Sequence, residues 1–279
     1  MAVDLHLHSN VSDGTDPPAV LMELAARAGV TVAALADHDT LDGLEEAAGA
    51  AERLGIRLIP AVELSVDHEG SKMHMLVYFT EPGPGPLQDR LAALLQGREE
   101  RNTLMVDKLN ALGFEITIEE VERQANGPSV GRPHIADALI ERGYFSHRNE
   151  AFADLLRDGG AAYLPRTRLT AEEAITLARS ANQVPVVAHA KTIPVPDGGY
   201  RALFEDLATI GLGGIEAYHS MHEPELRDHL AELAHSLGLA ATGGSDFHGI
   251  GKRDYKIATG TGDLRIPDWV VDDLDAQRS

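Results

Sequence analysis

Short apolar runs alternate with amphipathic segments along most of the chain, and this alternation predicts strands separated by helices. The runs expected to be strands lie at residues 3–8, 31–36, 57–63, 184–189, 214–218 and 239–242. The segments with apolar residues at helical spacing lie at residues 16–28, 41–54, 171–181, 200–209 and 223–237. Residues 64–68 and 72–79 are expected to pair as a hairpin around residues 69–71. About seven strands alternating with helices predict an α/β fold, either a barrel or a wound sheet.

The middle of the chain lacks this alternation. A cluster of proline and glycine residues at 82–86 interrupts the pattern, and residues 87–157 have helical spacing throughout. The apolar positions that show this spacing are Leu91, Leu94, Leu95, Met105, Leu109 and Leu112. We therefore expect residues 83–162 to be a helical insertion in a domain formed by residues 1–82 and 163–279.

The composition is that of an ordinary globular protein. The 279 residues are 43% hydrophobic and 24% charged, and the chain is long enough to bury one large core. No apolar run reaches the length of a membrane span, and no signal peptide is recognisable at the N-terminus. The chain has no cysteine, which excludes disulfides and thiolate metal sites. These features predict a cytoplasmic protein that does not bind membranes.

The charge balance is strongly acidic. The chain has 24 lysine and arginine residues against 44 aspartate and glutamate residues, a formal net charge of −20. Such a surface disfavours duplex DNA as a partner, because non-specific DNA binding depends on lysine and arginine meeting phosphates. An anionic substrate would need local positive charge, from bound cations or from a few arginines.

Pairs of metal-ligating side chains occur near both ends of the chain. His6 and His8 lie two residues apart in the first predicted strand, and Asp246 and His248 lie two residues apart after the last one. In an extended segment this spacing turns both side chains to the same side. About 240 residues separate the two pairs, so only a closed or tightly wound fold could bring them together.

Other histidines and carboxylates follow the ends of successive predicted strands, where α/β barrels place their sites. They are Asp13, His38, Glu63 and His189, together with His74, which lies early in its strand instead of late. Each residue alone has a simpler interpretation, as a surface or core histidine or as a turn residue. Their recurrence at one end of successive strands favours a metal cluster, because core packing does not require it.

These residues resemble the polymerase and histidinol phosphatase (PHP) superfamily over nearly the whole chain. The matching segments are His6-x-His8-Ser9, Ala36-Asp37-His38-Asp39, Glu63, His74, Ala188-His189 and Gly244-Ser245-Asp246-Phe247-His248. The resemblance implies a distorted seven-stranded (β/α) barrel that holds two or three divalent metal ions. Nitrogen and oxygen ligands of this kind suit Mn, Zn or Fe.

The resemblance also implies how the ligands are shared among the ions. The first ion takes His6, His8, Glu63 and Asp246, the second takes Glu63, His74 and His189, and the third takes Asp13, His38 and His248. Closely spaced divalent ions lower the pKa of a bridging water and neutralise charge on a phosphoryl oxygen. We therefore expect a metal-dependent phosphoesterase in which a metal-bridging hydroxide attacks phosphorus, with no serine or cysteine nucleophile.

The predicted insertion contains candidate phosphate contacts. Gly131-Arg132-Pro133-His134 places a proline where a helix begins, and a helix N-terminus beside a guanidinium can bind phosphate. A helix start with a surface arginine is the simpler interpretation. Together with Tyr163-Leu164-Pro165-Arg166, however, this segment resembles the PHP subgroup of nucleoside 3′,5′-bisphosphate phosphatases and 5′–3′ exoribonucleases. The resemblance makes Arg132, His134 and Arg166 candidate phosphate contacts, and the insertion a substrate-recognition cap.

One segment departs from that subgroup. The subgroup usually has Pro-Gly after the fifth-strand histidine, whereas this chain has Ala190-Lys191 after His189. Lys191 is therefore a further candidate for a positive charge near the substrate. No residue stands out as the general acid. His219 and His222 follow the sixth predicted strand and are candidates, although His222 also fits a loop residue with no catalytic role.

Together, these features predict an enzyme that removes the 3′-phosphate from nucleoside 3′,5′-bisphosphates. The alternatives are a 5′–3′ exoribonuclease on short RNA ends, a histidinol-phosphate-type phosphatase and a non-catalytic PHP binding module. The Gly-Arg-Pro-His segment argues against histidinol phosphate. A full set of ligands argues against a module that has lost catalysis. The expected partner is a small phosphorylated nucleotide.

Overall fold

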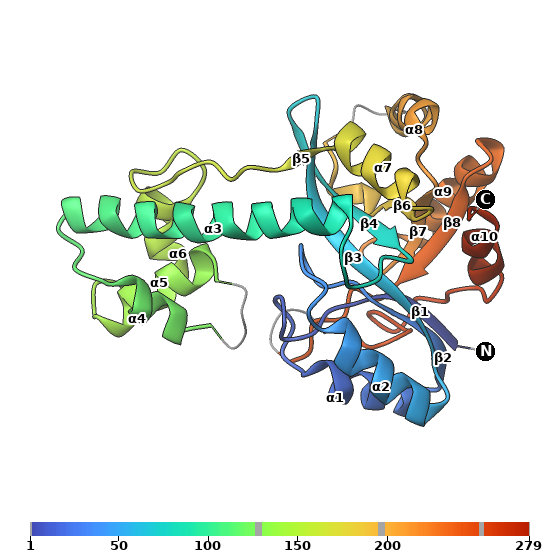
Figure 1. The fold of residues 1–279 in the computed structure, drawn as a ribbon, viewed down its shortest axis with the longest axis horizontal. Coiled ribbons are helices and arrows are strands. Elements are labelled where there is room, and N and C mark those ends of the chain that lie inside the picture. The colour runs from blue at the N-terminus through green and yellow to red at the C-terminus, as the bar shows by residue number, and fades with distance from the viewer. Residues whose placement is uncertain (1, 126–129, 195–198, 251–253, 279) are drawn as a thin grey trace. The chain divides into compact units, whose positions relative to one another are not determined.

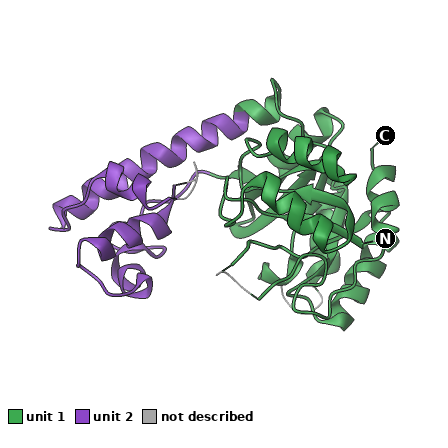
Figure 2. Cartoon of the chain, turned by 90° about the horizontal axis from the view of Figure 1, so that it is seen from below, with its two compact units in different colours: residues 1–89, 168–279 green, residues 90–167 purple. Residues whose placement is uncertain are grey.

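The computed structural model describes residues 2–125, 130–194, 199–250 and 254–278. The chain forms two compact units, one of residues 1–89 and 168–279 and the other of residues 90–167 (Figure 2). We call them the barrel unit and the helical unit. In the part of the chain that is described, no helix is both long and apolar enough to cross a membrane.

A strongly curved sheet forms the centre of the barrel unit (Figure 1). Its main path runs in the order β1-β2-β3-β4-β6-β7-β8. The strands are β1 (Ala2–Leu7), β2 (Val30–Leu35), β3 (Arg57–His68), β4 (Ser71–Tyr78), β6 (Val184–Val187), β7 (Gly214–His219) and β8 (Ala240–Gly244). The short β5 (Leu169–Thr170) pairs with β3 outside this path. Neighbouring strands run parallel, except that β4 is antiparallel to both β3 and β6.

The first and last strands meet and nearly close the sheet into a barrel, which confirms the predicted fold. The His8 amide donates to the Phe247 carbonyl at 3.0 Å, and the Asp246 amide donates to the His6 carbonyl at 2.9 Å. The buried Asp4 carboxylate accepts hydrogen bonds from the amides of Ser245 at 2.8 Å and Ala258 at 2.7 Å. The two terminal pairs of candidate ligands are therefore neighbours.

The barrel unit's helices connect and cover the strands. They are α1 (Pro18–Arg27), α2 (Leu44–Leu54), α7 (Ala171–Ser180), α8 (Gly199–Ile210), α9 (Pro224–Ser236) and α10 (Val270–Ala276), with the 3₁₀ turn η2 (Ala190–Thr192) after β6. Local signals explain several boundaries: Pro18 begins α1, and left-handed Gly55 ends α2. Helix α10 was not expected from the sequence. It buries Val270 and Leu274 in the same core as apolar residues of β1 and β6.

The helical unit has a core of its own. It contains most of α3 (Pro86–Ala111), followed by α4 (Ile118–Arg123), α5 (Arg132–Glu141), α6 (Arg148–Ala151) and the π-helical turn η1 (Phe152–Leu156). Met105, Leu109, Ile135 and Leu139 are among its fully buried residues. Helix α3 begins in the barrel unit and continues into the helical unit. The helical unit spans residues 90–167, so both of its limits lie a few residues later in the chain than the expected limits of 83 and 162.

Barrel closure depends on the absence of a side chain at Gly244. A Cβ atom there would lie 2.2 Å from the His6 Cβ, and real Cβ atoms do not approach so closely. We expect Gly244→Ala to lower the free energy of unfolding by about 2 kcal/mol or more, because β1 and β8 must separate. Urea unfolding would measure the loss. Gly49→Ala in α2 is the control, since nothing closer than 3.7 Å faces that position. Equal stability of the two variants would contradict this account of closure.

Candidate metal centre

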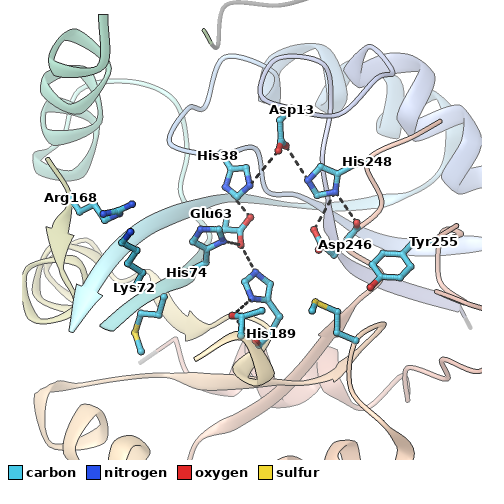
Figure 3. Close-up of a pocket in the computed structure, with 13 residues that line it drawn as sticks. Asp13, His38, Glu63, Lys72, His74, Arg168, His189, Asp246, His248 and Tyr255 are labelled. Carbon is cyan, nitrogen blue, oxygen red and sulfur yellow. Dashed lines mark hydrogen bonds and ion pairs between the residues drawn. The ribbon is translucent and has the colours of Figure 1, made fainter. Parts of the chain in front are cut away.

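All nine predicted metal ligands lie around one end of the barrel. They come from the end of β1 and the loop after it, the loop after β2, strands β3 and β4, and the segments after β6 and β8. Seven of them line a common pocket, namely Asp13, His38, Glu63, His74, His189, Asp246 and His248 (Figure 3). The rings of His8 and His248 stack at a centroid distance of 4.1 Å, which brings the first and last strands' ligands into contact.

The antiparallel direction of β4 explains the position of His74. In a strand that runs opposite to its neighbours, an early residue lies at the same end of the sheet as the late residues of parallel strands. His74 pairs with Ser65 of β3, and its Nδ1 lies 2.9 Å from Glu63 Oε1. The residue that did not fit the strand-end pattern is therefore part of the same cluster.

Glu63 is the centre of the cluster. Its Oε2 lies 3.3 Å from His6 Nε2, 3.2 Å from His8 Nε2 and 3.1 Å from His38 Nδ1. Its Oε1 lies 2.9 Å from both His74 Nδ1 and His189 Nε2. The side chain is 1% exposed. A carboxylate in this position can bridge two ions, which is the role that the PHP resemblance implies.

A second group of ligands lies beside the first. Asp13 Oδ1 is 3.0 Å from His248 Nε2, and Asp13 Oδ2 is 3.8 Å from His38 Nε2. His8, Asp13, His38 and His248 can each offer an atom within 4.8 Å of the others. Asp246 Oδ1 lies 3.4 Å from His8 Nε2. The geometry thus has room for more than one ion, with His8 between the groups.

The buried donor atoms fit a divalent cation. His6 Nε2, both ring nitrogens of His8, His38 Nδ1 and Glu63 Oε2 are buried without a hydrogen-bond partner among the described residues. Leaving such atoms unsatisfied costs free energy, and a bound cation would satisfy them together. Imidazole nitrogens with carboxylate oxygens suit Mn, Zn or Fe.

The charges of the cluster are strongly coupled. Burial alone would lower the pKa of His8, but the adjacent carboxylates of Asp246 and Glu63 outweigh it and raise that pKa to about 10. Burial raises the pKa of Glu63, and the surrounding His38, His74 and His6 outweigh it, so the pKa falls well below its usual value. Glu63 is therefore ionised. Bound metal would replace the imidazolium charges, since a histidine ligand must be neutral.

Glu216 was not singled out from the sequence, although it forms hydrogen bonds with two of the metal ligands. This residue of β7 is fully buried. Its Oε1 lies 2.8 Å from His6 Nδ1, and its Oε2 accepts a 2.7 Å hydrogen bond from the His189 amide. The contact fixes the proton of His6 on Nδ1 and leaves Nε2 facing Glu63. The available signal was a glutamate inside an otherwise apolar strand.

Asp37 and two serines support the loop that carries Asp13. Both oxygens of the Asp37 carboxylate accept hydrogen bonds, from the Ser9 amide at 2.8 Å, the Ser9 hydroxyl at 2.6 Å and the Ser12 hydroxyl at 2.6 Å. Asp37 therefore uses its carboxylate to hold the protein, while the adjacent His38 faces the cluster.

The candidate phosphate contacts fall in both units. In the helical unit, Arg132 donates to the Leu156 carbonyl at 3.0 Å and to Asp158 at 2.8 Å, and its guanidinium lies 5.3 Å from the Tyr163 ring centroid. His134 Nδ1 accepts the Gly131 amide at 3.0 Å. In the barrel unit, Lys191 contacts the Glu223 carboxylate and the Met221 carbonyl.

Arg132 and Arg166 belong to a cationic group in the helical unit. Burial lowers the pKa of Arg101, and the positive charges of Arg132, Arg166 and Arg98 add to this effect, so that the pKa falls to about 10. Like charges that perturb one another in this way favour binding of an anion.

The two candidate general acids differ in their surroundings. His222 is 1% exposed, donates from Nδ1 to the Ala217 carbonyl at 2.9 Å and accepts the Lys191 amide at Nε2 at 3.4 Å. His219 accepts the Met221 amide at Nδ1, and its Nε2 lies 3.6 Å from Asp246 Oδ2. His219 therefore contacts the cluster directly, whereas the ring of His222 is held by the backbone.

A pocket of about 410 Å³ opens over the cluster within the barrel unit. Glu63, His74 and Asp246 form part of its wall. Its lining also includes residues that sequence reasoning did not single out: Lys72, Met73, Arg168, Thr192, Met221 and Tyr255. A pocket of this size is within the range that binds small molecules.

The fold and the ligand cluster define a metal-dependent phosphoesterase, and comparison with known proteins agrees. The PHP domain profile matches residues 4–166. The chain belongs to the PHP family. It is an enzyme of the phosphoric ester hydrolase class.

Relatives that cover nearly the whole chain carry three activities in their names. A phosphoribosyl 1,2-cyclic phosphate 1,2-diphosphodiesterase of Eggerthella lenta is 33% identical, covering 89% of this chain and 95% of its own. A 5′-3′ exoribonuclease of Haemophilus influenzae is 33% identical, and the match covers 88% of this chain and 89% of the relative. A 3′,5′-nucleoside bisphosphate phosphatase of Chromobacterium violaceum is 31% identical, covering 90% of each chain.

Two solved structures share the fold of this chain. A protein from Bifidobacterium adolescentis that is assigned as a metal-dependent phosphoesterase superposes with a TM-score of 0.81 at 32% identity, covering 99% of this chain and 96% of its own. An amidohydrolase of Chromobacterium violaceum with bound sulfate also has a TM-score of 0.81, at 29% identity, covering 99% and 97%.

The position of Glu216 leads to a prediction about metal affinity. We expect Glu216→Gln to weaken metal binding about 10- to 100-fold, because His6 loses the charged acceptor that fixes its tautomer. Titration of the metal-free protein with Mn²⁺ in a calorimeter would measure the change. Glu205→Gln is the control, since Glu205 is an exposed residue of α8 that pairs with Arg201. Unchanged affinity in Glu216→Gln would show that Glu216 has only a packing role.

The burial of His222 predicts a pH dependence of stability. Burial lowers the pKa of His222 to about 4, so the unfolded chain, with an ordinary pKa near 6.5, binds its proton more readily. This stabilising contribution is complete above about pH 6.5 and decreases as the pH falls toward 4, by about 3 kcal/mol in total. Urea unfolding in EDTA from pH 7.5 to 4.5 should show a shallower slope for His222→Gln than for wild type. Identical slopes would contradict the prediction.

Proposed function

We propose that this phosphoesterase acts on small phosphorylated nucleotides and removes the 3′-phosphate from a nucleoside 3′,5′-bisphosphate. The observation that carries the proposal is the Glu63-centred cluster, which has buried nitrogens and oxygens without hydrogen-bond partners and lies beneath a pocket of about 410 Å³. The name of the Chromobacterium violaceum relative supports this substrate.

The residues of the chain have separate roles in this proposal. His6, His8, Asp13, His38, Glu63, His74, His189, Asp246 and His248 hold the divalent ions. Bound ions of this kind lower the pKa of a water molecule and neutralise phosphoryl charge. Glu216 keeps His6 and His189 oriented. His219, in contact with Asp246, is better placed than His222 to act near the leaving group.

The helical unit is proposed to be the substrate-recognition cap. Its cationic group includes Arg132 and Arg166, and His134 lies at the start of α5. Planar guanidinium groups bind phosphate oxygens in pairs, which suits them to holding a phosphate that is not hydrolysed. Lys191 would contribute positive charge from the barrel unit.

Two other activities have specific support. The Haemophilus influenzae relative makes a 5′–3′ exoribonuclease on short RNA ends the second candidate, and the Eggerthella lenta relative makes cyclic phosphate diester hydrolysis a third. All of these reactions break a phosphoester bond of a ribose phosphate. The leaving group and the size of the substrate distinguish them.

A substrate panel would test the proposed function. We expect the Mn²⁺-loaded protein to release phosphate from adenosine 3′,5′-bisphosphate faster than from AMP or histidinol phosphate. Short RNA and short DNA should be poorer substrates when nucleotide release is followed by chromatography. The fastest turnover on RNA would favour the exoribonuclease, and no turnover of any substrate by fully metallated protein would exclude the enzymatic proposal.

The role of Arg132 has its own test. Arg132→Ala should raise KM for adenosine 3′,5′-bisphosphate about tenfold or more, since a charge-assisted hydrogen bond to phosphate contributes about 1.5 to 3 kcal/mol. Metal content, measured by elemental analysis, should not change. Arg148→Ala is the matched control because Arg148 also pairs with an aspartate, Asp137, on the helical unit. Loss of metal from Arg132→Ala would show that the arginine has been assigned the wrong role.

A further inference from the structure

The pocket over the metal ligands is lined in part by a tyrosine and a methionine that are partly exposed. They are Tyr255 and Met221, and among the described residues Tyr255 is the only phenylalanine, tyrosine or tryptophan in the lining. Figure 3 shows Tyr255 on the side of the pocket where Asp246 and His248 lie, whereas Arg168 is on the other side. The pocket therefore has an aromatic surface on the same side as the ligands that follow the last strand.

His219 connects these two residues to the metal centre. Its ring meets the Tyr255 ring edge-on, with the centroids 6.5 Å apart and an angle of 89° between the planes. Its Nδ1 accepts a 3.0 Å hydrogen bond from the Met221 amide, and its Nε2 lies 3.6 Å from Asp246 Oδ2. In the proposed reaction the leaving group carries the nucleoside, so a nucleoside that leaves beside His219 would lie next to Tyr255 and Met221.

The segment that carries Tyr255 is fixed to the barrel unit. The Ala258 amide donates a 2.7 Å hydrogen bond to the buried Asp4 carboxylate, and the side chains of Ile257 and Leu264 are buried. A tyrosine side chain also has only two χ angles, so little conformational entropy is lost when a ligand packs against it. The Tyr255 ring is therefore preorganised to contact a ligand in the pocket.

The chemistry of this surface suits a flat aromatic ligand. A nucleobase can stack on a tyrosine ring, and such stacking tolerates any base because every base has a π-face. The methionine thioether is polarizable and also packs favourably against aromatic rings. A phosphorylated sugar without a base has no aromatic ring that could use these contacts.

We propose that Tyr255 and Met221 form a nucleobase-binding wall, on which the base of the substrate stacks while its phosphate is held at the metal centre. The contact uses the face of the Tyr255 ring and not its hydroxyl group. The wall makes the enzyme selective for nucleoside phosphates over phosphorylated sugars, without selecting one base. This inference rests on the proposed phosphoesterase function, and it assigns a contact to the base, for which no residue has been named so far.

The test compares adenosine 3′,5′-bisphosphate with a base-free analogue that has hydrogen at C1′ of the ribose in place of adenine. For the Mn²⁺-loaded wild-type protein we expect kcat/KM to be about tenfold or more higher for the nucleotide than for the analogue, mainly through KM. Tyr255→Ala should bring this ratio close to one, and Met221→Ala should reduce it less. Tyr255→Phe should keep the ratio within about twofold of the wild-type value, because phenylalanine retains the ring face.

A matched control and two contrary results make the test decisive. Tyr144→Ala removes a tyrosine of the helical unit that packs against Phe114 and does not line this pocket, so it should leave the ratio unchanged. An unchanged ratio in Tyr255→Ala would overturn the wall, even if both substrates lost activity equally, because the residue would then serve the phosphate or the fold. A loss in Tyr255→Phe as large as that in Tyr255→Ala would overturn it as well, since the hydroxyl group would then be responsible.

A binding measurement separates this proposal from the proposed function. If the wild-type protein turns over neither compound, equilibrium dialysis can compare the affinities of the two compounds for the Mn²⁺-loaded protein. Tighter binding of the nucleotide that is lost in Tyr255→Ala and kept in Tyr255→Phe would support the wall even though the proposed reaction had failed. Equal binding of both compounds by the wild-type protein would overturn the wall.

Discussion

The burial of the Glu63 carboxylate is the constraint on which the rest of this structure depends. Five imidazoles approach its two oxygens within 2.9 to 3.3 Å, and the side chain is 1% exposed. A buried charge is tolerated only when it is paired or bound to metal. The imidazoles come from strands and loops that are far apart in the sequence, so a stable environment for Glu63 requires the barrel to be nearly closed.

Three other buried carboxylates maintain that arrangement without facing the pocket. Asp4 connects the first strand to the segments after the last one, Asp37 holds the loop of Asp13, and Glu216 orients His6 and His189. Each accepts two or more hydrogen bonds, which compensates its burial. A metalloenzyme needs such support because ligand positions must be fixed before the ions bind.

Much of the fold follows from local sequence signals, and the exceptions have a physical cause. The apolar runs place seven strands within a few residues of their observed bounds, although β3 continues to His68 and includes the first arm of the hairpin. The two-residue β5 and the helix α10 were not predicted. The first is too short to show any periodicity, and the second is recognisable chiefly by its packing against the barrel core.

The sequence by itself determined the residue types and spacings of the candidate ligands, since the pattern of histidine and carboxylate at strand ends is local. The tertiary structure decided which of them meet: β4 runs antiparallel, so His74 joins the cluster, and β1 contacts β8, so His8 stacks on His248. Glu216 contacts His6, which lies 210 residues earlier in the chain, and β5 pairs with β3 through Leu169 and Val66. A single sequence does not encode such long-range contacts in any local pattern, and only folding brings these residues together.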